Sequence, residues 1–198
     1  GKSTKRDMRL VIIKYNAGNI QSVSFALERL GVEFHITDNP EEIQKADKVI
    51  FPGVGEASTT MNYLRDRKLD KVIRGLKQPL LGVCLGMQLM CKYSEENNTD
   101  CLGIFDESVR MFVPTGDMKV PHMGWNNLTL TNGWLDPAIE NQYAYFVHSY
   151  YVPVNPCSSA ITEYINRFSA AMHKDNFYAV QFHPEKSAAT GELVIQSF

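Results

Sequence analysis

Three residues of this chain have the chemistry of a nucleophile, a base and a carboxylate that orients the base: Cys84, His183 and Glu185. Cys84 stands between Gly82 and Gly86, directly after an apolar stretch. A cysteine nucleophile needs an imidazole to take its proton, and a carboxylate on the other imidazole nitrogen fixes the tautomer. Together these residue types indicate covalent catalysis by a thiol.

The cysteine is predicted to lie at a strand-to-helix junction. Residues 79–83 have the length and apolar content of a buried strand, and the chain from Leu85 onward predicts a helix. A nucleophile on such a turn is pushed out of the sheet's edge in a strained backbone, close glycines prevent clashes, and the helix start favours a thiolate. A core cysteine at an ordinary strand end would show the same short motif, because free cysteine packs like a small apolar side chain.

His183 and Glu185 are expected to share one face of an extended segment. Residues 178–182 predict a strand, and side chains two positions apart on a strand point the same way. A strand that ends at Pro184, followed by a solvated Glu185, fits the same residues. Neither the cysteine motif nor the histidine motif decides the function alone.

Taken together, the two stretches resemble a known family. Gly82-Val83-Cys84-Leu85-Gly86-Met87-Gln88 with a distal His183-Pro184-Glu185 resembles the class I, triad-type glutamine amidotransferases. Within this family, the chain from about Met8 to its end looks like the glutaminase subunits of imidazole glycerol phosphate synthase, of histidine biosynthesis. The further matching segments are residues 15–19, 52–55, 121–126 and 145–151, and Trp125 separates this branch from the anthranilate, GMP and carbamoyl phosphate branches.

The resemblance implies a role for each matching residue. Cys84, His183 and Glu185 would form the catalytic triad, and the N–H groups of Val54 and Leu85 would form the oxyanion hole. The implied substrate-binding residues are Gly53, Gly55, Gln88, His148, Ser149 and Tyr150, and the implied partner interface holds Asn16, Asn19, Trp125 and Asn126. Simpler interpretations remain open: a loop at 52–55, an aromatic strand that only packs at 145–151, a surface position for Gln88 and a core position for Trp125.

The activity that the resemblance implies is hydrolysis of L-glutamine to glutamate and ammonia through a cysteine thioester. The implied partner is a (β/α) barrel cyclase that consumes the ammonia in making imidazole glycerol phosphate and AICAR, with no metal or organic cofactor in the glutaminase. A glutaminase for another synthase, such as the pyridoxal phosphate or anthranilate system, is the alternative, and Met87 and residues 123–126 weigh against it. A non-catalytic binding or redox-sensing domain, with Cys84 as an oxidisable thiol, is a further alternative.

The bulk properties limit the other function classes. With 198 residues, 44% of them hydrophobic, the chain suits one domain over 8–198, and we expect 1–7 to be a cloning remnant. A net charge of −2 gives no basic face for nucleic acid or anionic membranes. No apolar run approaches the roughly 20 residues that span a bilayer, and no signal peptide precedes the first strand. We expect a cytoplasmic heterodimer whose cysteines are reduced thiols and form no zinc site.

The pattern of elements predicts an α/β fold: a doubly wound, mostly parallel sheet, flavodoxin-like in the family it resembles. Expected strands at 10–14, 33–37 and 49–51 alternate with helices at 21–30, from Asn39 and at 58–67. Residues 94–100 are expected to form a loop. Between 109 and 173, short runs predict added antiparallel strands, and residues 187–198 predict a closing helix. The expected short strands are 109–113, 118–120, 127–131, 143–152, 160–165 and 168–173.

Overall fold

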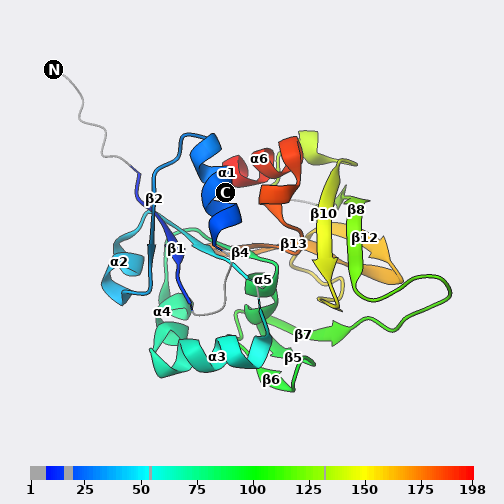
Figure 1. Ribbon diagram of the computed structural model, residues 1–198, viewed down its shortest axis with the longest axis horizontal. Coiled ribbons are helices and arrows are strands. Elements are labelled where there is room, and N and C mark those ends of the chain that lie inside the picture. The colour runs from blue at the N-terminus through cyan, green and yellow to red at the C-terminus, as the bar shows by residue number, and fades with distance from the viewer. Residues whose placement is uncertain (1–7, 16–19, 54, 132) are drawn as a thin grey trace.

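The computed structural model describes residues 8–15, 20–53, 55–131 and 133–198. These residues form a main sheet with helices on both faces, beside two smaller sheets (Figure 1). The helices are α1 (Gln21–Arg29), α2 (Pro40–Lys45), α3 (Ala57–Asp66), α4 (Leu69–Gly75), α5 (Leu85–Leu89) and α6 (Ala188–Ser197), with 3₁₀ turns η1 (Pro137–Ile139) and η2 (Pro184–Lys186).

The strands are β1 (Leu10–Ile13), β2 (Phe34–Thr37), β3 (Lys48–Phe51), β4 (Leu80–Val83), β5 (Cys91–Ser94), β6 (Thr99–Asp100), β7 (Phe105–Met111), β8 (His122–Asn127), β9 (Thr129–Leu130), β10 (Tyr143–His148), β11 (Tyr150–Tyr151), β12 (Ser158–Tyr164), β13 (Asn166–Lys174) and β14 (Phe177–Val180).

The main sheet has the order β2-β1-β3-β4-β14-β13-β12-β9. The strands from β2 to β14 run parallel, and β13, β12 and β9 continue the sheet antiparallel. Val83 at the end of β4 pairs with Val180 at the end of β14. The doubly wound α/β prediction is therefore confirmed, and the carboxyl ends of these two central strands meet at one edge, where open α/β sheets place their sites.

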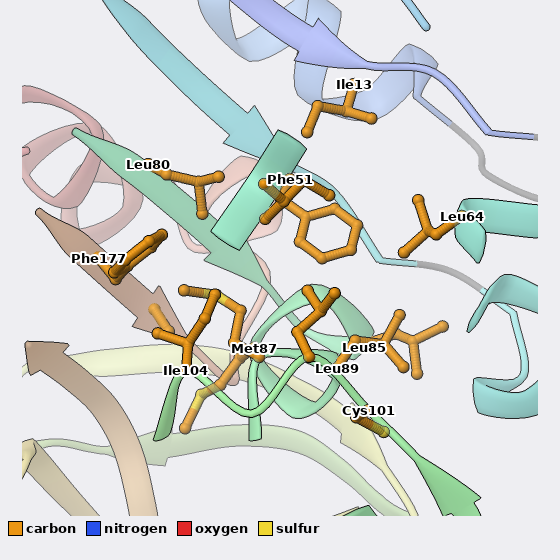
Figure 2. Packing of buried hydrophobic residues seen from close by; sticks show 14 of the residues in the cluster. Ile13, Phe51, Leu64, Leu80, Leu85, Met87, Leu89, Cys101, Ile104 and Phe177 are labelled. Atoms are coloured by element: carbon orange, nitrogen blue, oxygen red, sulfur yellow. The ribbon is translucent and has the colours of Figure 1, made fainter. Parts of the chain in front are cut away.

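Two apolar layers cover the faces of the sheet. Side chains alternate along a strand, so β1 supplies Val11 and Ile13 to one layer and Leu10 and Ile12 to the other. The first layer packs against α2 to α5, and Figure 2 shows Phe51 of β3 within it. The second layer packs against α1, α6 and β10. Both central strands are thus buried on both sides, which fixes the positions of their ends.

Several sequence-based predictions in the middle of the chain are wrong. Residues 94–100 do not form a simple loop, because β6 pairs with β5 in a small sheet. The helix predicted from Leu85 onward already ends at Leu89, and Cys91 is the first residue of β5. Lys68 adopts a left-handed φ of 58° and separates α3 from the unpredicted α4. No glycine or proline marks that break, so the sequence carries no signal for it.

A predicted strand at 118–120 is likewise absent, and the strand in this region is β8 instead. Its residues include glycine and two asparagines, which have low strand propensity. Pairing with β10 over its whole length holds β8 extended, with Trp125 opposite Tyr145. Tertiary pairing therefore overrides local preference at this strand.

Candidate active site

Cys84 lies at the turn between β4 and α5, with φ 54° and ψ −113°. A positive φ is sterically costly for a residue with a Cβ atom, and such strain persists only where the surroundings enforce it. Strand β14 helps to enforce this conformation, because the Cys84 N–H donates to the Val180 oxygen at 2.9 Å. The structure thus contains the strained strand-to-helix turn that the sequence predicts.

The two glycines around the cysteine have no room for a side chain. A Cβ on Gly82 would lie 2.4 Å from Met90 Sδ, and a Cβ on Gly86 would lie 2.2 Å from the Phe51 oxygen. The second contact is with backbone, which cannot move aside as a flexible side chain can. Close packing of the turn therefore requires the Gly-x-Cys-x-Gly spacing.

Gly53 meets this turn from the end of β3. A Cβ at this position would lie 2.5 Å from the Leu85 nitrogen and 2.1 Å from the Gly86 nitrogen. A side chain at position 53 would thus press on the first amide groups of α5. The glycine keeps the backbone nitrogen next to Cys84 uncovered on this side, which an oxyanion site at the Leu85 N–H requires.

The main chain of His183 is fixed by hydrogen bonds to β10 and to the start of α6. Its N–H donates to the Tyr145 oxygen at 3.0 Å, and its carbonyl accepts from Ser187 Oγ at 2.6 Å. The Ser187 hydroxyl also accepts from the Tyr145 N–H at 3.0 Å. The His183 Nδ1 lies 2.7 Å from Glu185 Oε1, and both side chains are largely buried. The pair has the geometry of a base and its orienting carboxylate.

The sequence-based reason for this pairing is wrong. β14 ends at Val180, and residues 184–186 form the turn η2, so an extended segment does not carry both side chains. Pro184 has its φ fixed near the helical value and suits the first position of such a turn. Glu185 therefore reaches back to His183 through a tight turn. A Cβ on Gly191 of α6 would lie 1.7 Å from the Pro184 oxygen, so α6 packs directly against η2.

The Cys84 thiol is buried and donates to the main-chain oxygen of Gln181 at 3.0 Å. Burial raises the pKa of the Cys84 thiol well above its usual value, the Glu185 carboxylate raises it further, and the Lys186 ammonium lowers it. The resting site thus favours the neutral thiol rather than the expected thiolate, because desolvation outweighs the influence of the helix start. A thiol with a raised pKa needs a base that takes its proton as it reacts.

A cavity of about 370 Å³ opens beside the thiol. Its size falls in the range of small-molecule sites. The structure brings together the predicted site residues Gly53, Gly55, Cys84, Leu85, Gln88, His148, Ser149, Tyr150 and His183 in its lining. The Glu185 carboxylate lies behind His183, outside the lining.

Gln88 lies in the cavity wall with a fixed amide orientation. Its Nε2 donates to the Tyr150 oxygen at 2.9 Å and to Gln181 Oε1 at 2.8 Å. Both N–H groups are used in these bonds, so the amide presents an acceptor on its remaining side. Gln88 is therefore equipped to accept a hydrogen bond from a donor in the cavity.

Comparison with known proteins identifies the family. The family described as "Glutamine amidotransferase class-I" matches residues 11–197 of the chain. This chain belongs to the class-I glutamine amidotransferase family. The "Imidazole glycerol phosphate synthase subunit HisH" of Bacteroides thetaiotaomicron is 59% identical over 96% of this chain and 98% of that protein. The "Imidazole glycerol phosphate synthase subunit HisH 1" of Vibrio vulnificus is 42% identical over 97% of this chain and 98% of that protein.

The fold of this amidotransferase also occurs in solved structures. The structure of PurLQS from Thermotoga maritima superposes with a TM-score of 0.71 at 16% identity, covering 97% of each chain. The α/β class, the amidotransferase family and the glutaminase class of enzyme are all confirmed as predicted from the cysteine and histidine motifs. The relatives also confirm the similarity to the synthase subunit of histidine biosynthesis.

Four residues in the cavity lining of the amidotransferase were missed in the sequence: Glu96, Pro121, Val147 and Gln181. Glu96 stands in the segment expected to be a loop, and only the pairing of β5 and β6 brings it to the cavity. Gln181 follows β14 directly, and its Nε2 is buried without a hydrogen-bond partner among the described residues. The spacing of two residues between Gln181 and His183 was the sequence signal that could have placed Gln181 at the site.

The predicted interface residues have different surroundings. Trp125 on β8 is 53% exposed and contacts the Tyr145 ring at a centroid distance of 5.9 Å, so it is not a core residue. Asn126 turns inward, and its Nδ2 donates to the Glu163 oxygen at 2.9 Å. Asn16, Asn19 and Val54, the last a predicted oxyanion-hole donor, lie outside the residues that the structure describes.

Proposed function

We propose that this amidotransferase hydrolyses L-glutamine and delivers the ammonia to a synthase partner in histidine biosynthesis. The partner is a (β/α) barrel cyclase that makes imidazole glycerol phosphate and AICAR. The observation that carries this proposal is the convergence of the Cys84 thiol and the paired His183 imidazole on one cavity. The HisH subunit that is 59% identical to this chain supports the pathway.

In the first half of the reaction, Cys84 Sγ attacks the side-chain amide carbon of glutamine. The thiol proton passes to His183, and the carbonyl electrons move onto the oxygen, which rests on the Leu85 and Val54 N–H groups. Each such donor lowers the barrier by about 3 kcal/mol. The C–N bond then breaks, His183 returns the proton to the departing nitrogen, and ammonia leaves a thioester on Cys84.

In the second half, water replaces ammonia in the cavity. His183 takes a proton from the water as its oxygen attacks the thioester carbon, and the same oxyanion site holds the developing charge. The C–S bond breaks, the proton returns to the sulfur, and glutamate leaves. Glu185 keeps the imidazole in one tautomer and stabilises its charged form in both halves.

The polar groups of the cavity suit the two ends of glutamine. The Glu96 carboxylate in the wall matches an α-ammonium group, and it is held by a hydrogen bond from the Ala57 N–H at 2.7 Å. The Gln88 amide and the backbone around Ser149 offer hydrogen bonds along the substrate. The side-chain amide of glutamine then points toward Cys84.

An exposed apolar face next to the cavity supports docking of the partner. Met123 and Trp125 of β8 and Tyr143 of β10 are each more than half exposed, and they share this face with Tyr145 and Val147. We call these five residues the outer face. Val147 also lines the cavity, so the outer face adjoins the cavity. Contiguous exposed apolar surface of this kind marks interaction sites.

In this proposal the chain forms one domain over residues 8–198 and works in a cytoplasmic heterodimer. Ammonia released into bulk water would be largely protonated and would lose its nucleophilicity, which is a physical reason for a closed complex. Within the described part of the chain, no helix has the length and apolar character to cross a membrane. The Gly53–Val54 peptide is proposed to turn its N–H toward the oxyanion only when the partner is bound.

The direct test measures glutamate release from glutamine by the isolated chain, by the chain with the barrel cyclase, and by the complex with the cyclase ligand bound. We expect slow hydrolysis by the isolated chain and a rise of roughly a hundredfold to a thousandfold in the liganded complex, the effect of one oxyanion donor. No glutamate release in any of the three states would refute the glutaminase, and full activity of the isolated chain would refute the partner control.

The outer face is tested by Met123→Asp. The charge should weaken cyclase binding and reduce the activation, while the basal rate of the isolated chain stays unchanged. Ile36→Asp on the edge strand β2, where Ile36 is 45% exposed, is the matched control and should bind normally. Equal binding of the cyclase by both variants would show that the outer face is not the interface.

A further inference from the structure

Two buried histidines lie against each other at the cavity wall. His122 of β8 and His148 of β10 are opposite in the strand pairing, and each is less than a tenth exposed. His122 Nδ1 lies 3.0 Å from His148 Nε2. His148 lines the cavity, but His122 does not. The proposed reaction makes no use of His122.

At both ends of this histidine pair, the neighbouring group has only one possible hydrogen-bonding role, as donor or as acceptor. At one end, Asn126 Nδ2 donates to the Glu163 oxygen at 2.9 Å, and Asn126 Oδ1 accepts from the Asn127 N–H at 2.9 Å. The amide orientation is thereby set, and its second N–H faces His122 Nε2 at 3.4 Å. At the other end, His148 Nδ1 lies 2.8 Å from the Tyr150 oxygen, which can only accept.

These two ends determine both tautomers. His148 must carry its hydrogen on Nδ1, so its Nε2 accepts from the Nδ1–H of His122, and His122 Nε2 accepts from Asn126. All three hydrogen bonds run in one direction, from Asn126 to the Tyr150 carbonyl. An additional proton on either ring would bring two donors together at one of these contacts.

The surroundings of the pair also favour two neutral rings. The His122 ring stacks between Tyr164, at a centroid distance of 4.1 Å, and Phe146, at 4.9 Å. The His148 ring packs against Phe168 at 5.0 Å and Phe112 at 5.2 Å. Burial lowers the pKa of His122 to about 4 and that of His148 to about 3, and His183 adds to the second effect. The aromatic contacts also leave neither ring free to turn.

The chain of bonds continues into the cavity wall. The Tyr150 oxygen accepts a second hydrogen bond, from Gln88 Nε2 at 2.9 Å, and the same Nε2 donates to Gln181 Oε1. The position of the Tyr150 carbonyl thus sets where Gln88 places its amide. Figure 1 shows β8 and β10 side by side at the end of the main sheet away from β2. The series of hydrogen bonds that begins at Asn126 of β8 therefore starts well outside the turn that carries Cys84.

We propose that His122 is a positioning residue for glutamine binding, acting through the His148 ring on the Tyr150 carbonyl and the Gln88 amide. This inference rests on the proposed glutaminase function. Without the donor from His122, the buried His148 Nε2 has no hydrogen-bond partner, and the His148 Nδ1–H donates more weakly to the Tyr150 carbonyl because the successive bonds no longer polarise one another. The Tyr150 carbonyl is then held less firmly, and so is the Gln88 amide that donates to it. Glutamine binding is affected, and the thiol chemistry at Cys84 is not.

The test compares steady-state glutamate release by His122→Phe and wild type in the liganded complex at saturating cyclase. Phenylalanine keeps the ring stack but removes both hydrogen bonds. The KM for glutamine should rise by about tenfold, the effect of one lost hydrogen bond, with kcat changed far less. His122→Gln, which can both accept and donate, should restore part of the affinity. His35→Phe, the same exchange at an exposed residue of β2, should leave KM unchanged.

Alkylation of Cys84 by iodoacetamide separates this role from damage to the fold. The reagent needs the thiol but not the glutamine contacts, so its rate should be equal in wild type and His122→Phe. An unchanged KM, or a loss confined to kcat, in an active His122→Phe enzyme overturns the inference and leaves the proposed function intact. An inactive wild-type complex overturns the proposed function itself.

Asn126→Asp provides a second variant in case the buried exchange prevents folding. This half-buried side chain keeps its shape but faces His122 Nε2 with an acceptor. A neutral His122 that donates to this acceptor has no hydrogen left on Nδ1, so its bond to His148 Nε2 is lost. A raised KM for glutamine with nearly constant kcat is again expected. A KM equal to that of the wild type in this variant also overturns the inference.

Discussion

The Cys84 thiol donates to the main-chain oxygen of Gln181 at 3.0 Å, although the His183 imidazole lines the same cavity. A carbonyl oxygen accepts a hydrogen bond but does not take the proton at neutral pH, so the thiol is held in an unreactive state. In the proposed reaction, bound glutamine turns the S–H bond from Gln181 toward the imidazole before attack. The strained turn at Cys84 and the fixed main chain of His183 keep the two groups ready for that change.

The Glu185 carboxylate is predicted to act through the imidazole alone. Glu185→Gln keeps the shape of the side chain but removes the charge that fixes the tautomer of His183. We expect kcat for glutamate release to fall roughly 10²–10⁴-fold, the usual contribution of a general acid–base group, with little change in melting temperature. Glu192→Gln, an exposed site on α6, is the matched control. Unchanged turnover in Glu185→Gln would assign the orienting role to another group.

Gly191 is predicted to hold η2 in place through direct contact of α6. In Gly191→Ala the added Cβ would lie 1.7 Å from the Pro184 oxygen, so α6 or the turn must move. Overpacking of this kind costs about 1–3 kcal/mol of unfolding free energy, and a displaced turn misplaces His183 and Glu185. Urea unfolding and glutamate release should therefore both show losses.

Gly75→Ala is the control for that exchange. A Cβ at the end of α4 meets no heavy atom within 4 Å, so neither stability nor turnover should fall. If Gly191→Ala matches the wild type in turnover, the contact between α6 and η2 does not position the base.

The buried histidine pair predicts how stability depends on pH. In the folded state the pKa is about 4 for His122 and about 3 for His148, whereas both titrate near 6.5 when unfolded. Between these limits the unfolded chain binds protons that the folded chain does not. The free energy of unfolding should therefore fall as the pH drops below about 6.5, by up to roughly 1.4 kcal/mol per pH unit for each histidine.

Urea unfolding between pH 7 and pH 5 measures this slope. His122→Phe removes one of the two groups and should show a shallower loss of stability than the wild type. Carboxylates contribute nearly equally to both proteins, so the difference between the slopes isolates the histidine. Parallel curves for the two proteins would mean that His122 is not held neutral by the fold.

Most of the fold could be predicted from local sequence patterns. The buried strands β1, β3 and β4 and the amphipathic helix α1 follow from apolar stretches and periodicity that do not depend on the rest of the chain. β8 and α4 do not, because pairing with β10 and a left-handed Lys68 determine them. Local signals thus predict the central sheet and the added strands β10, β12 and β13, and they fail at β8 and α4.

The residues of the candidate site also fall into those that local sequence predicts and those that it does not. Cys84 and its glycines form a local motif whose strain follows from the packing of one turn. Glu96 and His122 come from segments that the small sheets bring toward the cavity, and neither strand propensity nor residue spacing in those segments predicts that placement. Glu185 was paired with His183 for a wrong reason, since a proline-led turn and not an extended chain joins them.

The central claim is that glutamine is consumed at Cys84 and that its ammonia feeds a partner, and Cys84→Ala tests it most directly. The measurement is product formation by the complex of Cys84→Ala with the barrel cyclase, once with glutamine and once with an ammonium salt, beside wild type. Cys91→Ala, an exchange at another buried thiol, is the control and should work with both nitrogen sources. We expect Cys84→Ala to form product from the ammonium salt at the wild-type rate and none from glutamine. Product formation from glutamine near the wild-type rate would contradict the account.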